Sequence, residues 1–212
     1  MDDGLFTQFH DPMFIIQIFI VIISLVIHEF AHALTADLLG DKTARMQGRL
    51  TLNPIAHLEL VGLLMLLFAP IGWARPVPIN ARNFKNPRLG FMVTAAAGPI
   101  SNLLLAILCI VALIVFPFSQ FNMAGQILAR GLLVNIALFV FNLIPLPPLD
   151  GSQIVRNLLP YRYLVWYSRL DVYGPFILLM LFMLPQAGQT LFMPAVYFVI
   201  KLLASMFGLY FV

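Results

Sequence analysis

The feature that most constrains this chain is a series of five long apolar runs separated by short polar stretches. The runs are Pro12–Leu34, Phe91–Phe116, Ile127–Leu149, Val172–Leu184 and Leu191–Val212. A membrane-spanning helix needs about 20 consecutive apolar residues, and only the fourth run is clearly short. Charged residues make up 10% of the chain, whereas a soluble domain has about 25%. The sequence therefore predicts an all-α integral membrane protein, with residues 1–212 forming one polytopic domain of about five to six transmembrane helices.

A sixth run, Leu58–Trp73, is shorter and is interrupted by Gly62, Pro70 and Gly72. Three segments contain most of the basic residues: Lys42, Arg45 and Arg49; Arg75, Arg82, Lys85 and Arg88; and Arg156, Arg162 and Arg169. Positive charge collects in cytoplasmic loops. All three segments lie on that side only if the N-terminus is outside and Leu58–Trp73 does not cross.

We therefore expect Leu58–Trp73 to be re-entrant, in a multi-pass protein of the cell membrane with its basic loops in the cytoplasm. The stretch before it, "ARMQGRLTLNP", alternates in the manner of a strand or hairpin. The whole chain has a single cysteine, Cys109, which excludes an intrachain disulfide. The chain has no basic cluster of the kind that binds nucleic acid, so the lipid bilayer is the partner that the composition indicates.

The first apolar run contains the stretch "SLVIHEFAHALTADL", in which ionisable residues interrupt an otherwise apolar segment. Such residues are costly inside a membrane and indicate function. His28 and His32 lie one turn apart on the same helical face. Two imidazoles in this arrangement can chelate one Zn²⁺, and Glu29 beside them can act as a general base. The alternative interpretation is that the histidines are interhelical hydrogen-bonding residues.

A catalytic zinc needs a third protein ligand, and Asp150 is the strongest candidate. It follows the third run in "FNLIPLPPLDGSQI", where prolines prevent a regular helix and can direct a carboxylate into the bundle. The alternative is a turn residue, because Asp-Gly is a common turn pair. The other acidic residues fit less well, being at the opposite face (Asp2, Asp3, Asp11), at the end of the first helix (Asp37, Asp41) or in predicted loops (Glu59, Asp171). His57 and Glu59 are the next candidates.

The pairing of "HEFAH" on a transmembrane helix with "NLIPLPPLDG" resembles the site-2 protease family of intramembrane zinc metalloproteases. The resemblance extends from the first run through Gly151 and is closest to compact prokaryotic members without PDZ or CBS domains. It implies that His28, His32 and Asp150 hold one Zn²⁺ per chain and that Glu29 is the catalytic base. It also implies that Asn142, and Asn102 in "AAAGPISN", bind substrate or support the transition state.

The motifs and the resemblance together predict a membrane peptidase domain, a zinc metalloendopeptidase of the HExxH type. The resemblance implies that its substrates are transmembrane helices, cut near the cytoplasmic face in regulated intramembrane proteolysis or in clearance of signal-peptide remnants. The alternative function is a membrane metal or ion transporter that uses the His/Asp cluster. A transporter would need such residues at several depths, whereas here they cluster near one face. The sequence does not identify the substrate or the oligomeric state.

Overall fold

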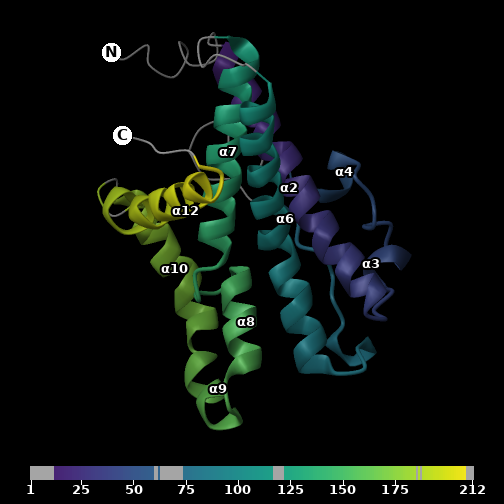
Figure 1. The fold of residues 1–212 in the computed structure, drawn as a ribbon. Helices are drawn as coiled ribbons and strands as arrows, with labels where there is room; N and C mark the ends of the chain where they lie inside the picture. Colours follow the sequence, from purple (N-terminus) through teal and green to yellow (C-terminus); the bar gives the residue numbers. More distant parts are fainter. Residues whose placement is uncertain are drawn as a thin grey trace, which may run out of the picture.

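The computed structural model of the protein describes residues 12–59, 62, 74–116, 122–184, 186 and 188–208. Three helices in these ranges are long and apolar enough to cross a membrane: α2 (Pro12–Leu38), α6 (Pro87–Val115) and α7 (Met123–Asn142). They run side by side along the long axis of the molecule, and α6 packs against both α2 and α7 (Figure 1). This bundle is the frame on which the functional side chains are placed.

The predictions for the first three apolar runs agree with α2, α6 and α7. The third helix is shorter than its run, because α7 ends at Asn142 and the prolines that follow cannot continue it. The fourth run forms α10 (Leu170–Met183), which follows α9 (Tyr161–Tyr167), and these two helices meet at a bend of 48°. The fifth forms α12 (Met193–Met206), which begins after the π-helical turn η2 (Gly188–Phe192).

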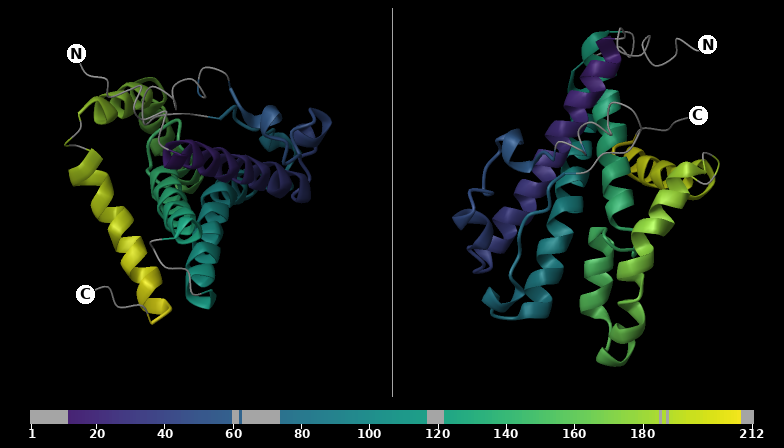
Figure 2. Two further views of the ribbon diagram at one scale, coloured as in Figure 1. Left: turned by 90° about the horizontal axis from the view of Figure 1, so that it is seen from above. Right: turned by 180° about the vertical axis from the view of Figure 1, so that it is seen from behind.

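The number of spans is lower than expected in the described part of the chain. Three helices qualify, or four if α9 and α10 form one bent span. Helix α12 has 14 residues, which is about 21 Å of helix, less than the roughly 30 Å of a bilayer core. It lies across α7 instead of parallel to it, and Figure 2 shows α10 and α12 on the opposite side of the bundle from α3 and α4.

A core of interlocking aliphatic side chains holds α12 against the bundle. Its buried members are Ala106 and Ile110 of α6, Ile136 of α7, and Val196 and Leu203 of α12. In a membrane, helices gain little from the hydrophobic effect, and close van der Waals packing provides the attraction. This core therefore fixes α12 by the fit of its surfaces.

The expected hairpin over Ala44–Pro54 is wrong: the described part of this region contains two one-turn helices. They are α3 (Thr43–Met46) and α4 (Pro54–His57). Gly48 ends α3 with a positive φ of 68°, and the amide of Arg49 bonds to the carbonyl of Ala44 at 2.8 Å. This is the Schellman pattern of helix termination. The alternation of apolar and polar residues predicted a strand. The C-terminal capping hydrogen bonds at Gly48 and Arg49 instead stabilise the helical turn of α3.

The predicted re-entrant run Leu58–Trp73 lies mostly outside the described residues. Its flanks are described: Leu58 and Ala74 form an isolated antiparallel bridge. The amide of Arg75 also donates to the carbonyl of His57 at 2.7 Å. The chain therefore returns at Ala74 beside the point it left at Leu58. From Ala74 it continues without regular structure to η1 (Ala81–Asn83), just before α6.

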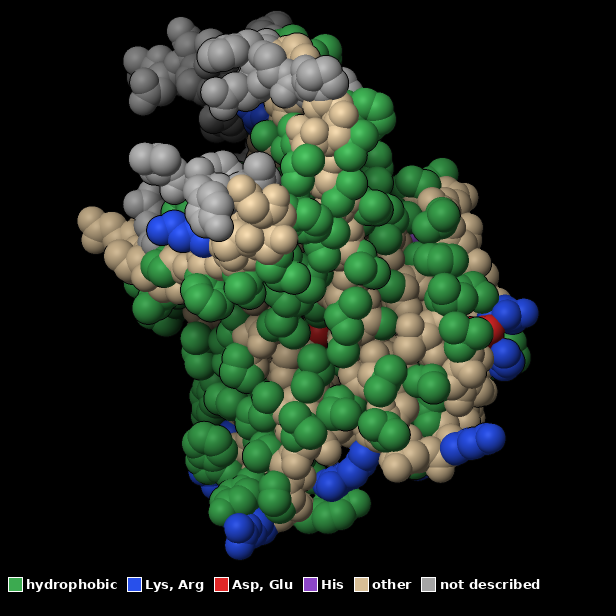
Figure 3. Space-filling model, viewed as in Figure 1, with side chains coloured by type: hydrophobic (Ala, Val, Ile, Leu, Met, Phe, Trp, Pro, Cys, Tyr) green, Lys and Arg blue, Asp and Glu red, His purple; other side chains and the backbone are tan. Residues whose placement is uncertain are grey.

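The three basic segments of the sequence lie in different elements. The first belongs to α3 and its flanks, the second runs from the residue after the Leu58–Ala74 bridge through η1 to the first turn of α6, and the third runs from α8 (Asp150–Leu158) through α9 to Arg169, which precedes α10. Lys and Arg side chains gather along the lower end of the face in Figure 3, and hydrophobic side chains cover most of the rest. Such an uneven distribution of basic side chains is expected for a membrane protein that is oriented by its basic loops.

Asp41 connects the end of α2 to the segment that precedes α6. It is fully buried and accepts hydrogen bonds from the Thr43 amide (3.1 Å) and hydroxyl (2.5 Å). It also accepts from the Asn80 amide and the Asn83 side chain, both at 2.7 Å. Burial opposes ionisation of Asp41, but these hydrogen bonds outweigh it, and the pKa of Asp41 lies below its usual value.

We expect Asp41→Asn to lower the free energy of unfolding at neutral pH by about 1–3 kcal/mol, because charge-assisted hydrogen bonds are lost. A carboxylate with a lowered folded-state pKa stabilises the fold above its unfolded pKa, about 3.9, and loses that effect as pH falls through the folded value. The difference from wild type should therefore shrink on acidification. Thermal unfolding in detergent at pH 7 and pH 3 measures it, with the exposed Asp171→Asn as control. An equal difference at both pH values would contradict this role.

Candidate metal centre

The two histidines of α2 and the first residue of α8 bring three potential metal ligands to one point. His28 and His32 are both buried, and their Nε2 atoms lie 3.0 Å apart. The Oδ2 atom of Asp150 lies 3.1 Å from the first and 3.3 Å from the second. All three potential ligand atoms lie within 4.8 Å of one another. Among the described residues, this is the one group of three or more His, Cys, Asp or Glu side chains close enough to hold a metal ion. Asp150 is far from the two histidines in the sequence, and the fold brings it to them.

The far sides of both imidazoles are held by α6. His28 Nδ1 donates to Asn102 Oδ1 at 2.6 Å, and His32 Nδ1 donates to the backbone carbonyl of Thr94 at 2.7 Å. A carbonyl only accepts, so His32 Nδ1 carries a proton, and the neutral imidazole then presents its Nε2 lone pair to the cluster. Hydrogen bonds of this kind orient metal-ligating histidines in proteins.

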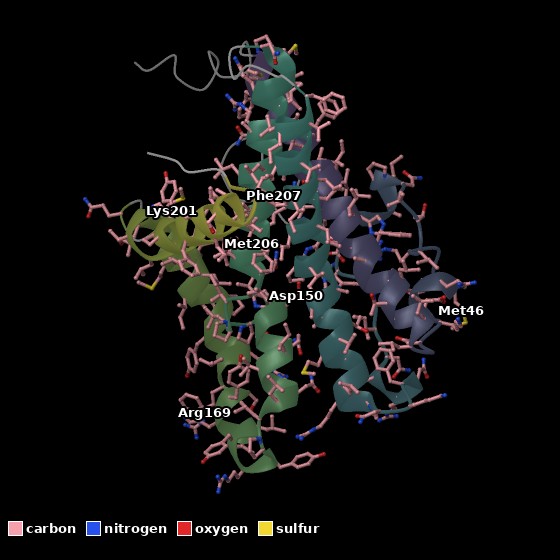
Figure 4. The ribbon with its side chains drawn as sticks, in the orientation of Figure 1. Met46, Asp150, Arg169, Lys201, Met206 and Phe207 are labelled. Atoms are coloured by element: carbon pink, nitrogen blue, oxygen red, sulfur yellow. The ribbon has the colours of Figure 1, made fainter. Side chains whose placement is uncertain are left out.

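Asp150 reaches the cluster because the chain breaks sharply between α7 and α8. A Cβ at Gly151 would lie 2.3 Å from the carbonyl oxygen of Leu143, and one at Gly174 of α10 would lie 2.2 Å from that of Pro147. The Tyr167 hydroxyl of α9 donates to the carbonyl of Pro145 at 2.9 Å. The proline turn is thus packed tightly against α8, α9 and α10. Figure 4 shows Asp150 at the start of α8, beside α6.

The surroundings of Asp150 favour its charged form. Its Oδ2 faces the Nε2 atoms of His28 and His32, at 3.1 Å and 3.3 Å. Its position in the first turn of α8 adds the favourable field of a helix N-terminus. A carboxylate is the form of this side chain that binds metal.

Gly98 of α6 leaves the space that the ligands occupy. A Cβ on Gly98 would lie 2.3 Å from His32 Nε2 and 2.5 Å from His28 Nε2, well inside van der Waals contact. The sequence alone did not predict that Gly98 contacts the histidines. Gly98 lies in the stretch "AAAGPISN", which drew attention as a motif, but only the fold shows that this part of α6 packs against His28 and His32 of α2. Two imidazole nitrogens and one carboxylate oxygen are a donor set typical of catalytic Zn²⁺, and with this space kept clear the residues fit that ion.

Glu29 lies beside the cluster and is partly exposed. Its Oε2 accepts a hydrogen bond from the backbone amide of Val77 at 3.1 Å. Val77 belongs to the irregular stretch before η1, so this bond ties that stretch to α2. The contact fixes one carboxylate oxygen of Glu29 in the same cavity as the three ligands.

A cavity of about 760 Å³ adjoins the cluster. Its polar lining residues are His28, Glu29, His32, Glu59, Asn142, Asp150 and Gln153. Most of the remaining lining is apolar and comes from α2, α6, α7, the stretch around Val77, and Phe192. An apolar pocket with a few convergent polar groups is the usual form of a binding site. An acidic side chain is visible at the centre of the face in Figure 3, where Figure 4 labels Asp150.

The two predicted asparagines occupy different places. Asn142, the last residue of α7, lines the cavity, and its Nδ2 donates to the Leu138 carbonyl at 3.0 Å. Asn102 is fully buried behind His28 and is not part of the cavity wall. The hydrogen bond to His28 Nδ1 puts Asn102 in position to orient this histidine. The role in substrate binding or transition-state support that the resemblance implies for Asn102 stays a prediction.

The reserve candidates for the third ligand lie outside the group of three. His57 is fully buried, and its Nε2 bonds to the Thr51 carbonyl at 2.7 Å, consistent with a structural role. Glu59 lines the cavity.

Comparison with known proteins identifies the family. YwhC of Bacillus subtilis, which is named a zinc metalloprotease, is 41% identical over 178 residues that cover 81% of each chain. The sequence model of Peptidase family M50 matches residues 119–184. The chain belongs to peptidase family M50, the site-2 protease family.

Other M50 relatives share less of their length with the chain. Rip2 of Mycolicibacterium smegmatis, also named a zinc metalloprotease, is 31% identical over 66% of this chain and 58% of its own. A zinc metalloprotease of Methanocaldococcus jannaschii is 30% identical over 68% of this chain and 34% of its own. No solved structure matches. Family membership and the apolar helices make the chain a membrane zinc protease, with Zn²⁺ as its cofactor.

We expect Gly98→Ala to abolish stoichiometric zinc binding, because the added methyl group would displace both Nε2 atoms. Zinc per chain in detergent-purified protein measures this. Ile110→Val is the control: Ile110 is buried on the same helix, in the core that contacts α12 and away from the three ligand atoms. A Gly98→Ala variant that keeps one zinc per chain would show that the cluster does not bind the metal as placed here.

Proposed function

We propose that this M50 protein is an intramembrane endopeptidase that cleaves transmembrane-helix substrates, with His28, His32 and Asp150 as zinc ligands and Glu29 as general base. The observation that carries the proposal is the convergence of three ligand atoms in a cavity that also contains Glu29. A transporter would need ligands at several depths. Among the described residues the ligands form one group, which favours the protease over the transporter.

Hydrolysis within a membrane requires that water reach a peptide bond surrounded by lipid. The polar residues of the cavity offer water a place beside the cluster. A bound Zn²⁺ supplies Lewis acidity that activates water and polarises the scissile carbonyl. The chain's own task is to hold the attacking water and the substrate carbonyl near the three ligands.

Glu29 is placed to move the proton. Its carboxylate takes the proton of the attacking water and passes it to the leaving amine. The Val77 amide holds one oxygen of this carboxylate, so the other can face the reacting groups. Asn142, on the cavity wall, donates a hydrogen bond to the substrate or to the developing oxyanion.

The proposed topology places the N-terminus outside, with the basic loops and the site toward the cytoplasm. The Lys and Arg side chains that lie mainly in the lower half of the face in Figure 3 support this orientation. The Leu58–Ala74 bridge brings the two ends of the predicted re-entrant run side by side. A membrane-tethered protein or a signal-peptide remnant is the proposed substrate, and its helix must unwind before its backbone can enter the cavity.

Zinc content tests the metal site without a substrate. Wild-type protein should retain about one zinc per chain, and His28→Ala should lose it, because removing one ligand leaves the ion two protein ligands. We expect Asp150→Ala to weaken zinc binding strongly for the same reason. Unchanged zinc in Asp150→Ala would mean that another residue is the third ligand, and His57→Ala and Glu59→Ala would then be tested.

Glu29→Gln tests the base. It should keep zinc near the wild-type level and lower cleavage about 10²–10⁴-fold, the usual contribution of general acid–base catalysis. Cleavage is measured in liposomes on single-span reporter helices that carry a Gly-Pro break near their cytoplasmic end. Glu59→Gln removes the other cavity glutamate and serves for comparison. A larger loss in Glu59→Gln than in Glu29→Gln would remove the base assignment.

A further inference from the structure

We propose that Asn135 of α7 is a positioning residue of the metal centre and acts through Asn102 on His28. The inference rests on the proposed zinc site, because it concerns how one of its ligands is kept in the binding form. In the sequence Asn135 is a lone polar residue in an apolar run, and such residues often join helices by hydrogen bonds. The structure shows where its hydrogen bonds lead.

The relay starts at a backbone carbonyl of α7. Asn135 Nδ2 donates to the carbonyl of Gly131 at 2.9 Å. Because that carbonyl can only accept, the amide of Asn135 is fixed with its Nδ2 toward Gly131 and its Oδ1 toward α6. Its Oδ1 accepts from Asn102 Nδ2, also at 2.9 Å.

The second step sets the orientation of Asn102. Its Nδ2 donates to Asn135 Oδ1 and, at 3.3 Å, to the carbonyl of Ser24 on α2. Both partners accept, so the Asn102 Oδ1 must face the other way, toward His28. There it lies 2.6 Å from His28 Nδ1. An oxygen at that position requires the His28 proton on Nδ1 and leaves the Nε2 lone pair for the metal.

Burial makes the relay difficult to replace with solvent. Asn102 is fully buried, and Asn135, His28 and Ser24 are each no more than 4% exposed. Hydrogen bonds in such a setting cannot be exchanged for bonds to water, and each polar group depends on its protein partner. A flipped Asn102 would present Nδ2 to His28 Nδ1 and favour the other tautomer, whose Nε2 proton would point at the cluster.

A bond that only joined α6 to α7 would have a different signature. Loss of Asn135 would then lower stability and leave zinc affinity unchanged. If Asn135 acts through Asn102, its removal lowers zinc affinity, and it has no further effect once Asn102 is absent. These two roles can therefore be separated by a double-mutant cycle.

We would measure zinc affinity by competition with a chromophoric chelator for wild type, Asn135→Leu, Asn102→Ala and the double variant, all purified in detergent. Leucine has a similar volume and suits an apolar helix. We expect Asn135→Leu to weaken zinc binding about 10–100-fold, the usual effect of losing a partner behind a metal ligand. The double variant should equal Asn102→Ala alone. Ile136→Val, a neighbouring buried change outside the relay, should bind zinc as wild type does.

Nitrogen-15 NMR of histidine-labelled, metal-free protein reads the tautomer directly. We expect His28 to carry its proton on Nδ1 in wild type and to populate the Nε2 form in Asn135→Leu. Wild-type affinity in Asn135→Leu, or additive losses in the double variant, would overturn the relay and leave the zinc site standing. Failure of wild type to bind zinc would instead remove the proposed function.

Discussion

The metal centre depends on two hydrogen bonds that α6 makes to the backs of two imidazoles on α2. His28 and His32 can turn their Nε2 atoms to one point only because Asn102 and the Thr94 carbonyl hold the Nδ1 atoms. Gly98 of the same helix clears the space in front of those Nε2 atoms. Helix α6 is therefore both the support and the rear wall of the site, which explains why it must be packed between α2 and α7.

The third ligand depends on a break in regular structure. Prolines end α7, and the chain turns tightly enough that Gly151 and Gly174 have no room for side chains. This turn puts Asp150 at the start of α8, where the helix dipole favours its charge. An uninterrupted α7 would have carried the same carboxylate past the cluster. Non-helical backbone at this depth is tolerated because protein surrounds it.

Polar groups in this bundle are not scattered. The buried asparagines of α6 and α7, Asn102 and Asn135, join in one chain of hydrogen bonds that ends at His28. Asp41 ties the end of α2 to the segment before α6. The irregular stretch around Val77 is linked to the site by its hydrogen bond to Glu29. The hydrogen bonds that join α2, α6 and α7 are therefore the same ones that contact the candidate metal ligand His28.

The sequence by itself determined the features that local spacing encodes. Apolar runs located α2, α6 and α7, the interval of four residues put His28 and His32 on one face, and the prolines predicted the break before Asp150. Local spacing failed where capping decided the outcome, as at Gly48, which turns an alternating stretch into the end of a helix. It also gave more spans than the described helices provide.

Only the tertiary structure decided which distant residues meet. Gly98 and Asn135 are ordinary residues in their own helices and gain meaning from the partners that packing brings to them. Asn102, expected at the substrate, lies behind His28 because α6 faces α2 with that side. Periodicity reports which face of a helix a residue occupies, but not which helix that face will meet. For this reason the candidate ligands could be proposed from the sequence, whereas the residues that contact them from α6 and α7 could not.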